Sequence, residues 1–308
     1  MTKTPAKGLI ALLRLPYWMM TGGLALLTSL AITKGAINPE TALLTFFSMA
    51  FITSAGFSIN DYFDKESDAI IKPQRPIPSG ALSLKQVATI SGVLFTAGLA
   101  LAALINNLSF IILLIDSALL FVYSALVKRK SGFAANILVG ILTGTAFLYG
   151  EATIYNSISL LALSLYPIAF GTIGGNVLRD VLSLEGDSKV GYPTLPQKIG
   201  NTNAVKIAAL FFTATGVLAP LPSILGEFTM YYLPLILLWS ILLIYASIRL
   251  ATTPAKVSNV RKYERIITMS MMLLPLSLII EAVSPVVQTF SLIFIILIYQ
   301  VSKSNSYT

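Results

Sequence analysis

Cysteine and histidine are both absent from this chain of 308 residues. The lack of cysteine excludes disulfides, iron–sulfur clusters and thiolate nucleophiles. The lack of histidine removes the commonest general base and the usual ligand of zinc and haem. A metal ion would therefore have only oxygen ligands, which suit Mg²⁺, Mn²⁺ or Ca²⁺. Proton transfer would fall to carboxylates, lysine, tyrosine, phosphate or water.

Charged residues are also scarce, at 11% of the chain, whereas a soluble domain carries about 25%. Hydrophobic residues make up 56% and the mean hydropathy is +0.81. So few charges cannot cover a soluble globule, which excludes a soluble enzyme, a disordered chain and, despite the net charge of +8, a nucleic-acid-binding module. Apolar segments of about 20 residues recur from end to end and predict an all-α polytopic membrane protein.

Ten apolar spans are expected, each a candidate transmembrane helix. Their approximate bounds are 15–34, 39–60, 84–105, 108–127, 133–150, 157–178, 204–224, 229–250, 265–282 and 286–301. Glu281 and Pro285 leave open that the last two spans form one broken element, which would give nine. We therefore expect one domain over residues 1–308, with nine to ten helices around a central cavity and cytoplasmic cap loops.

The distribution of positive charge predicts the orientation. With the N-terminus in the cytoplasm, every lysine and arginine except Lys34 falls on the cytoplasmic side, as the positive-inside rule requires. Glu151 and Glu281 are then expected at the outer surface. Asp116 lies inside the fourth span and is either functional or a structural hydrogen-bonding group. The pair Gly140 and Gly144 is expected to serve helix packing.

Two long cytoplasmic loops, 60–83 and 179–203, hold more than half of the 13 acidic residues. In the first, Asn60, Asp64 and Asp68 are four residues apart and share one face if the helix continues. Three prolines follow and place Lys72 and Arg75 on a stiff loop that can fold back over that face.

The second loop repeats this arrangement. Asp180 and Asp187 are two helical turns apart, and Ser183 lies near the same face. Carboxylates gathered in this way repel one another unless a cation lies between them. The alternative is a pair of solvated loops, but hydrated Mg²⁺ with a diphosphate is the natural occupant of such loops when lysine and arginine lie beside them.

These residues resemble the two signature motifs of the UbiA superfamily of membrane prenyltransferases. The first motif is matched by Asn60, Asp64 and Asp68, and the second, Glu-Gly-Asp followed by Thr-Leu-Pro, by residues 185–187 and 194–196. Residues 72–80 resemble the segment that follows the first motif in the family branch that makes archaeal ether lipids and chlorophyll. Ser183 departs from the family, which usually has aspartate there.

The resemblance implies transfer of an isoprenoid chain from its diphosphate, with Mg²⁺ as the cofactor, expected as two ions that bridge the diphosphate. The implied metal ligands are Asn60, Asp64, Asp68, Asp180 and Asp187. Asp64, Asp68 and Asp187 are the implied catalytic residues, with Asp68 as the proton acceptor. The implied diphosphate contacts are Lys72, Arg75, Tyr123, Lys128, Arg179 and Lys189.

Among the family's acceptors, the resemblance of residues 72–80 and of the second motif to the archaeal ether-lipid branch favours geranylgeranylglyceryl phosphate. The enzyme would then move a geranylgeranyl group from geranylgeranyl diphosphate to the glycerol C2 hydroxyl, in archaeal ether-lipid synthesis. Aromatic prenylation, as in quinone biosynthesis, is the alternative. A CDP-alcohol phosphatidyltransferase would need an Asp-Gly…Ala-Arg motif, which is absent, and an ion or phosphate transporter would need several ionisable residues at the membrane midplane. The expected partners are the lipid bilayer and these substrates, with neither nucleic acid nor haem.

Overall fold

The structure is a computed structural model that describes residues 4–189 and 191–283. Within these residues the regular secondary structure is entirely helical, and nine segments are long and apolar enough to cross a membrane. The prediction of an all-α multi-pass membrane protein is confirmed. The expected tenth span, 286–301, lies outside the described residues.

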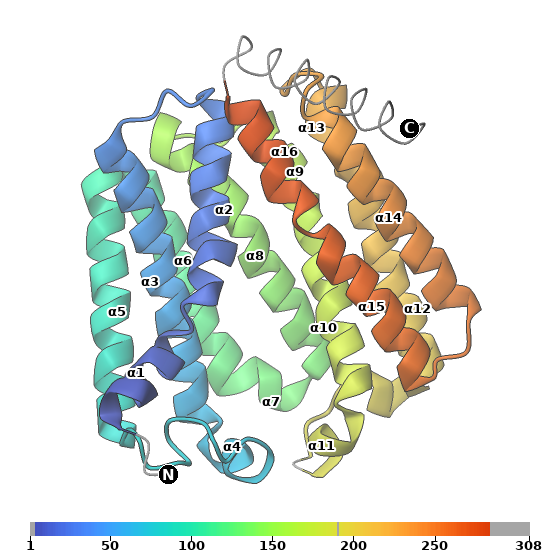
Figure 1. The fold of residues 1–308 in the computed structure, drawn as a ribbon. Helices are drawn as coiled ribbons and strands as arrows, with labels where there is room; N and C mark the ends of the chain where they lie inside the picture. The colour runs from blue at the N-terminus through green and yellow to red at the C-terminus, as the bar shows by residue number, and fades with distance from the viewer. Residues whose placement is uncertain (1–3, 190, 284–308) are drawn as a thin grey trace, which may run out of the picture.

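The first four spans lie in the blue to green part of Figure 1. The first span comprises α1 (Pro5–Leu13) and α2 (Pro16–Ile32), the second α3 (Pro39–Phe63), and the third α5 (Leu84–Ile105). The fourth comprises α6 (Asn107–Val122), a π-helical turn η1 (Tyr123–Val127) and α7 (Lys128–Lys130). The short helix α4 (Lys65–Ile71) lies in the first acidic loop.

The remaining five spans complete the bundle. They are α8 (Gly132–Tyr155); α9 (Leu160–Leu165) with the 3₁₀ turn η2 (Tyr166–Ala169) and α10 (Phe170–Leu182); α12 (Leu195–Leu218) with α13 (Leu221–Ile224); α14 (Leu233–Thr252); and α15 (Val257–Ser270) with α16 (Leu273–Ala282). The short helix α11 (Leu184–Lys189) lies in the second acidic loop.

Several helices begin where the sequence supplies a capping side chain. The Ser83 hydroxyl accepts from Gln86 N at 3.2 Å, and the Gln86 side chain accepts from Ser83 N at 2.8 Å, which forms a capping box for α5. Asn106 caps α6 and Ser131 caps α8, each through a side-chain oxygen that accepts from a backbone amide of the first turn. These caps satisfy amide groups that would otherwise lack a partner at the helix start.

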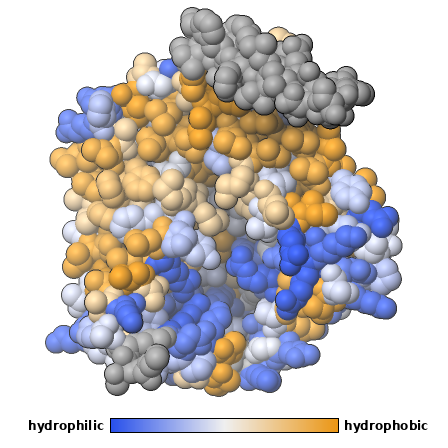
Figure 2. Space-filling model, viewed as in Figure 1, coloured by the Kyte–Doolittle hydropathy of each residue, from blue (hydrophilic) through white to orange (hydrophobic). Residues whose placement is uncertain are grey.

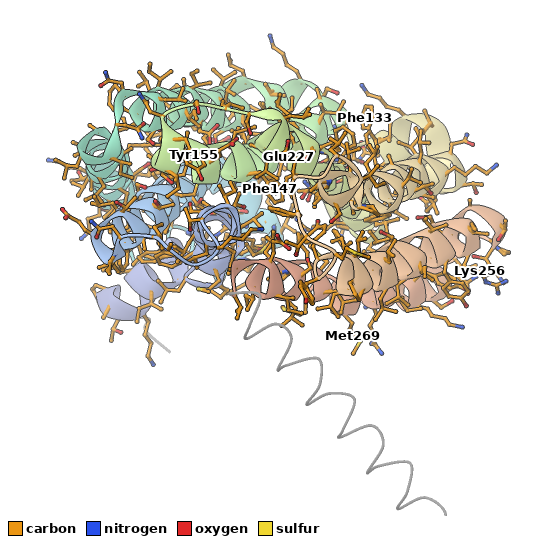
Figure 3. All side chains as sticks on the ribbon, turned by 90° about the horizontal axis from the view of Figure 1, so that it is seen from above. Phe133, Phe147, Tyr155, Glu227, Lys256 and Met269 are labelled. Carbon is orange, nitrogen blue, oxygen red and sulfur yellow. The ribbon has the colours of Figure 1, made fainter. Side chains whose placement is uncertain are left out.

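The helices form a closed ring. Each span packs against its neighbour in sequence, α8 also contacts α2 and α10, and α16 returns to pack against α2. In the view along the helices, Phe147 lies in the interior and Met269 and Lys256 lie at the margin (Figure 3). The Phe147 side chain is fully buried, whereas Met269 is 73% exposed, as expected for a side chain that faces lipid.

Small residues allow the helices to approach closely. A Cβ on Gly140 would lie 2.3 Å from Ile173 Cγ1, so α8 and α10 touch at this glycine. A Cβ on Gly144 would lie 2.7 Å from the Tyr166 ring. The expectation that this pair serves helix packing is therefore confirmed.

Acidic residues within the spans have protein partners. Asp116 is buried, and its Oδ2 accepts a hydrogen bond from Thr145 Oγ1 at 2.7 Å, which joins α6 to α8. Glu151 and Glu281, both expected at the outer surface, are instead 2% and 0% exposed. That expectation is wrong, because a charge pattern places a residue at a membrane end but does not show whether a neighbouring loop covers it.

Polar surface gathers at one end of the bundle. In Figure 2 the upper and middle surface is mostly hydrophobic, whereas hydrophilic residues cluster in the lower half and flank a hollow in the surface. This end also carries α4, α7 and α11 (Figure 1). We call it the loop end, because both acidic loops lie there.

Candidate active site

The first acidic motif follows a helical path that continues past the end of α3. The amide of Asp64 donates to Asn60 O at 2.9 Å, and the amide of Asp68 donates to Asp64 O at 2.8 Å. Asp64 is thus both the C-terminal cap of α3 and the N-terminal cap of α4. The three motif side chains therefore keep the i, i+4, i+8 spacing that puts them on one face.

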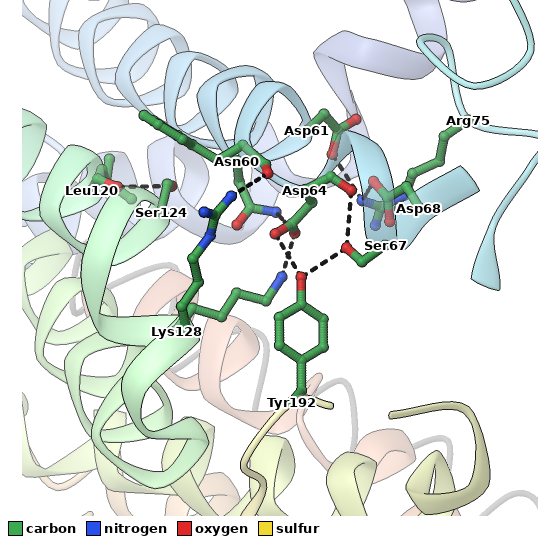
Figure 4. Close-up of polar contacts among 12 residues, drawn as sticks. Asn60, Asp61, Asp64, Ser67, Asp68, Arg75, Leu120, Ser124, Lys128 and Tyr192 are labelled. Carbon is green, nitrogen blue, oxygen red and sulfur yellow. Dashed lines mark hydrogen bonds and ion pairs between the residues drawn. The ribbon is translucent and has the colours of Figure 1, made fainter. Parts of the chain in front are cut away.

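The Asp64 carboxylate is buried, 3% exposed, and has three hydrogen-bond donors (Figure 4). Asn60 Nδ2 donates to Oδ2 at 2.9 Å, and the Lys128 ammonium forms an ion pair with the same oxygen. The Tyr192 hydroxyl donates to Oδ1 at 2.9 Å. Residues from α3, α7 and the second acidic loop thus converge on one carboxylate.

A second group of charges surrounds Asp68. Arg75 Nη1 lies 2.5 Å from Asp68 Oδ2 and 3.0 Å from Asp61 Oδ1. Asp61 Oδ1 also accepts from Arg14 Nη2 at 2.6 Å. The loop after α4 therefore folds back over the acidic face, as its proline-rich sequence predicts, and places Arg75 between Asp68 and Asp61.

Arg14 reaches this group because the first span breaks there. Its backbone is left-handed, with φ 49°, between α1 and α2. The Leu13 carbonyl left free by the break accepts from Ser54 Oγ at 2.7 Å and from Trp18 Nε1 at 3.1 Å. The Arg14 guanidinium also lies 4.4 Å from the centroid of the Phe57 ring. These contacts hold Arg14 against the end of α3.

The second acidic loop has its own partners. Asp180 Oδ2 accepts from Asn136 Nδ2 at 2.8 Å, and Asp187 Oδ2 accepts from Ser183 Oγ at 2.6 Å. The Ser183 hydroxyl, which also lies 2.9 Å from Arg179 O, therefore contacts the last aspartate of the motif. In the described part of the chain, no group of three or more carboxylates lies close enough to share a metal ion.

The remaining predicted residues lie around the rim. The side chains of Lys72, Arg179 and Lys189 are exposed at the loop end. Tyr123 is half-buried at the start of η1, and it is not one of the three donors to Asp64. The structure thus brings together the first-loop and α7 residues Asn60, Asp64, Asp68, Arg75 and Lys128, and leaves Asp180 and Asp187 in a separate group.

The donor set of the first motif fits a hard divalent cation. Asn60 Oδ1 is buried without a hydrogen-bond partner, and Asp64 and Asp68 offer buried carboxylate oxygens on the same face. Mg²⁺ binds through a few carboxylates and keeps several water ligands. Lys128 and Arg75 supply the positive charge at these carboxylates when no metal is bound.

Sequence reasoning missed Asp61, Arg14 and Tyr192 as members of the site. Asp61 was visible as an acid in the first loop, but its position falls off the four-residue spacing. Tyr192 carries no motif, and 128 residues separate it from Asp64. Burial raises the pKa of the Tyr192 phenol, which keeps it protonated and able to donate.

Known proteins resemble this chain in sequence and in fold. Two curated proteins named digeranylgeranylglyceryl phosphate synthase are similar to this chain. The protein of Natronomonas pharaonis is 34% identical over 227 residues, which are 74% of this chain and 81% of the relative. The protein of Halobacterium salinarum is 32% identical over 253 residues, or 81% and 90% of the two chains.

Solved structures share the fold. One described as a digeranylgeranylglyceryl phosphate synthase in membranes has a TM-score of 0.78 at 30% identity and covers 91% of this chain and 99% of its own. A UbiA homologue from Archaeoglobus fulgidus bound to DMAPP and Mg²⁺ has a TM-score of 0.65 at 21% identity, with coverage of 86% and 98%. Residues 22–274, which include both acidic loops, match the UbiA prenyltransferase family. The chain therefore belongs to the UbiA prenyltransferase family.

Proposed function

We propose that this protein transfers a geranylgeranyl group from geranylgeranyl diphosphate to the C2 hydroxyl of geranylgeranylglyceryl phosphate, a step of archaeal ether-lipid synthesis. Family membership and the names of the relatives support this reaction. The observation that carries it is the pairing of Asp64 with Lys128 and of Asp68 with Arg75 at one end of an apolar bundle. Acidic and basic groups so arranged suit a diphosphate with its metal.

Two Mg²⁺ ions that bridge the diphosphate are part of the proposal. Asn60, Asp64 and Asp68 would hold metal from the first loop, and Asp180 and Asp187 from the second. When bound, the metal would neutralise the diphosphate and stabilise the negative charge that develops on the leaving group. The buried Asn60 Oδ1 without a partner supports this assignment.

The basic residues would bind the diphosphate oxygens. Arg75 and Lys128 lie at the motif carboxylates, so each can turn from its aspartate to a phosphate oxygen a short distance away. Arginine suits this contact because its planar donors match phosphate oxygens in pairs. Tyr123 is proposed as a further donor, and the exposed Lys72, Arg179 and Lys189 would attract the anion at the rim.

Bond cleavage would proceed by ionisation. The bond between the prenyl C1 and the diphosphate oxygen breaks, which leaves an allylic cation that the apolar interior shields from water. The acceptor's C2 hydroxyl oxygen then forms the ether bond. Its proton passes to Asp68, and the diphosphate departs with the electron pair of the broken bond. Asp64, Asp68 and Asp187 are the proposed catalytic residues.

The proposed orientation places the N-terminus and both acidic loops in the cytoplasm. Every lysine and arginine except Lys34 then lies on the cytoplasmic side, which agrees with the positive-inside rule. Water-soluble diphosphate would reach the site from this side, while the prenyl chains stay in the bilayer. Cysteine labelling tests this in the cysteine-free chain: Lys189→Cys should react only from the cytoplasm, and Glu227→Cys only from outside.

Parallel assays with two different acceptors test the reaction. Purified protein is given geranylgeranyl diphosphate and Mg²⁺, with geranylgeranylglyceryl phosphate and 4-hydroxybenzoate in parallel reactions. We expect a digeranylgeranyl ether from the first acceptor, and loss of activity on chelation that Mg²⁺ restores. Product from 4-hydroxybenzoate alone would overturn the proposal in favour of aromatic prenylation.

A further inference from the structure

Tyr192 connects the two acidic loops although it belongs to neither motif. It follows α11 in the second loop, and its side chain points towards the first motif (Figure 4). The hydroxyl lies 2.9 Å from Asp64 Oδ1 and 2.8 Å from Ser67 Oγ. The loops also approach at a second point, where a Cβ on Gly186 would lie 3.7 Å from Ile71 Cγ2.

The hydrogen bond between Tyr192 and the Asp64 carboxylate has a definite direction. A phenol has one hydrogen, and Asp64 Oδ1 is a carboxylate oxygen that only accepts, so Tyr192 donates to Asp64. The single hydroxyl hydrogen of Ser67 is shared between the phenol oxygen at 2.8 Å and Asp64 O at 2.9 Å. The bond from Tyr192 to Asp64 ends on a charged group and is therefore the strongest of these contacts.

These bonds leave Asp64 one defined position for a cation. A carboxylate has about four acceptor positions. Asn60 and Lys128 use the two on Oδ2, and Tyr192 uses one on Oδ1. The remaining position lies on Oδ1, next to the phenol. The phenol therefore fixes the carboxylate torsion and with it the direction of the free position.

The ring of Tyr192 acts on a second member of the site. The Lys128 ammonium lies 5.1 Å from the ring centroid, within the range of a cation–π contact. One side chain thus orients both a proposed metal ligand and a proposed diphosphate contact. No other residue in the described part of the chain contacts both Asp64 and Lys128 from the second loop.

We propose that Tyr192 is a positioning residue that couples the second acidic loop to the first and presents Asp64 and Lys128 to a metal–diphosphate ligand. This rests on the proposed function only in the class of ligand, a diphosphate with a divalent cation. The hydroxyl acts on Asp64 and the ring acts on Lys128, so the two contributions can be separated by substitution.

Binding of inorganic diphosphate with Mg²⁺ tests this without turnover. Titration calorimetry on detergent-purified protein compares wild type with Tyr192→Phe, which keeps the ring, and Tyr192→Leu, which keeps neither group. We expect the dissociation constant to rise about tenfold in Tyr192→Phe, the effect of losing one hydrogen bond to a charged group. A further rise of about threefold is expected in Tyr192→Leu, from loss of the cation–π contact. Ser67→Ala, which removes the hydroxyl contacts with the phenol and with Asp64 O but keeps the bond from Tyr192 to the carboxylate, should have a smaller effect than Tyr192→Phe.

Tyr263→Phe is the matched control, because its hydroxyl lies 3.2 Å from Arg249 Nε and neither residue belongs to an acidic loop. It should bind like wild type. In turnover, Tyr192→Phe should raise the KM for the diphosphate substrate more than it lowers kcat, with the melting temperature unchanged. Unchanged or tighter binding in Tyr192→Phe, or no binding of the probe by wild type, would overturn the proposal. If the Tyr192 variants weaken binding as expected but the wild-type protein transfers no prenyl group, the result contradicts the proposed function alone.

Discussion

Arg75 and Asp68 form a partly buried ion pair, with Nη1 and Oδ2 2.5 Å apart, that joins the proline-rich loop to the end of the first motif. The same nitrogen also contacts Asp61. One guanidinium therefore holds two carboxylates that would repel each other without it. The basic segment after the motif is in this way part of the site and not a separate loop.

Substitution of Arg75 tests both its ion pairs with the two aspartates and its proposed contact with the diphosphate. We expect Arg75→Ala to lower kcat/KM about 100-fold or more, the typical effect of removing one group that stabilises developing negative charge. Arg75→Lys should recover only part of this, because an ammonium cannot make paired bonds to phosphate. Steady-state assays with varied diphosphate substrate measure both. Full activity of Arg75→Lys would contradict a role for the planar donors.

The neutral variants Asp64→Asn and Asp68→Asn test the metal assignment. They keep the size of the side chain and lose its charge. Activity should fall more than about 100-fold, since residues that merely orient a metal ligand already cost about 10- to 100-fold. Added Mg²⁺ should also no longer raise the melting temperature in the presence of inorganic diphosphate. Glu66→Gln is the control, because Glu66 is exposed in the same loop. Activity retained in Asp64→Asn would refute the assignment.

Glu281 closes the helix ring at the end opposite the acidic loops. It is fully buried, forms an ion pair with Lys34, and accepts from Thr229 N at 3.0 Å and from Thr229 Oγ1 at 2.6 Å. Glu281→Leu should destabilise the protein by about 2–4 kcal/mol, because it leaves buried donors without an acceptor. Thermal unfolding in detergent measures this. Glu281→Gln should lose less, and both variants should keep their substrate KM at low temperature. A larger loss in Glu281→Gln would contradict the hydrogen-bond account.

Gly140 tests the close approach of α8 and α10. Gly140→Ala would put a methyl group 2.3 Å from Ile173 Cγ1, so we expect a loss of about 1–3 kcal/mol from overpacking. Gly92→Ala on α5 is the matched control, since a Cβ added there would have nothing within 4 Å. That variant should be neutral or slightly stabilising. Equal melting temperatures for the two variants would show that α8 and α10 can separate at no cost.

Local patterns in the sequence predict most of the fold. Runs of apolar residues indicated the spans, and the expected starts at residues 84 and 133 lie within one residue of the starts of α5 and α8. The helix α1 and the break after it at Arg14 were not expected, because the first span was placed at 15–34. Only the partners of the break, Ser54 and Trp18, make a left-handed residue acceptable there.

The site was predictable where its residues are periodic and hidden where they are not. Asn60, Asp64 and Asp68 stand out by spacing, and that spacing survives in the structure. Asp61 and Tyr192 act through contacts between segments far apart in sequence, which no local period records. The same holds for Glu281, whose burial depends on a loop more than 50 residues earlier in the chain.

The paired charges around the first motif balance. Asp61, Asp64 and Asp68 face three cations, Arg14, Arg75 and Lys128. Because these six charges sum to zero, the six side chains can lie together beside an apolar interior without a bound ion. A lone metal ion or a lone diphosphate would upset this balance, whereas the two together add little net charge. We therefore expect strongly synergistic binding, in which each ion raises the affinity for the other.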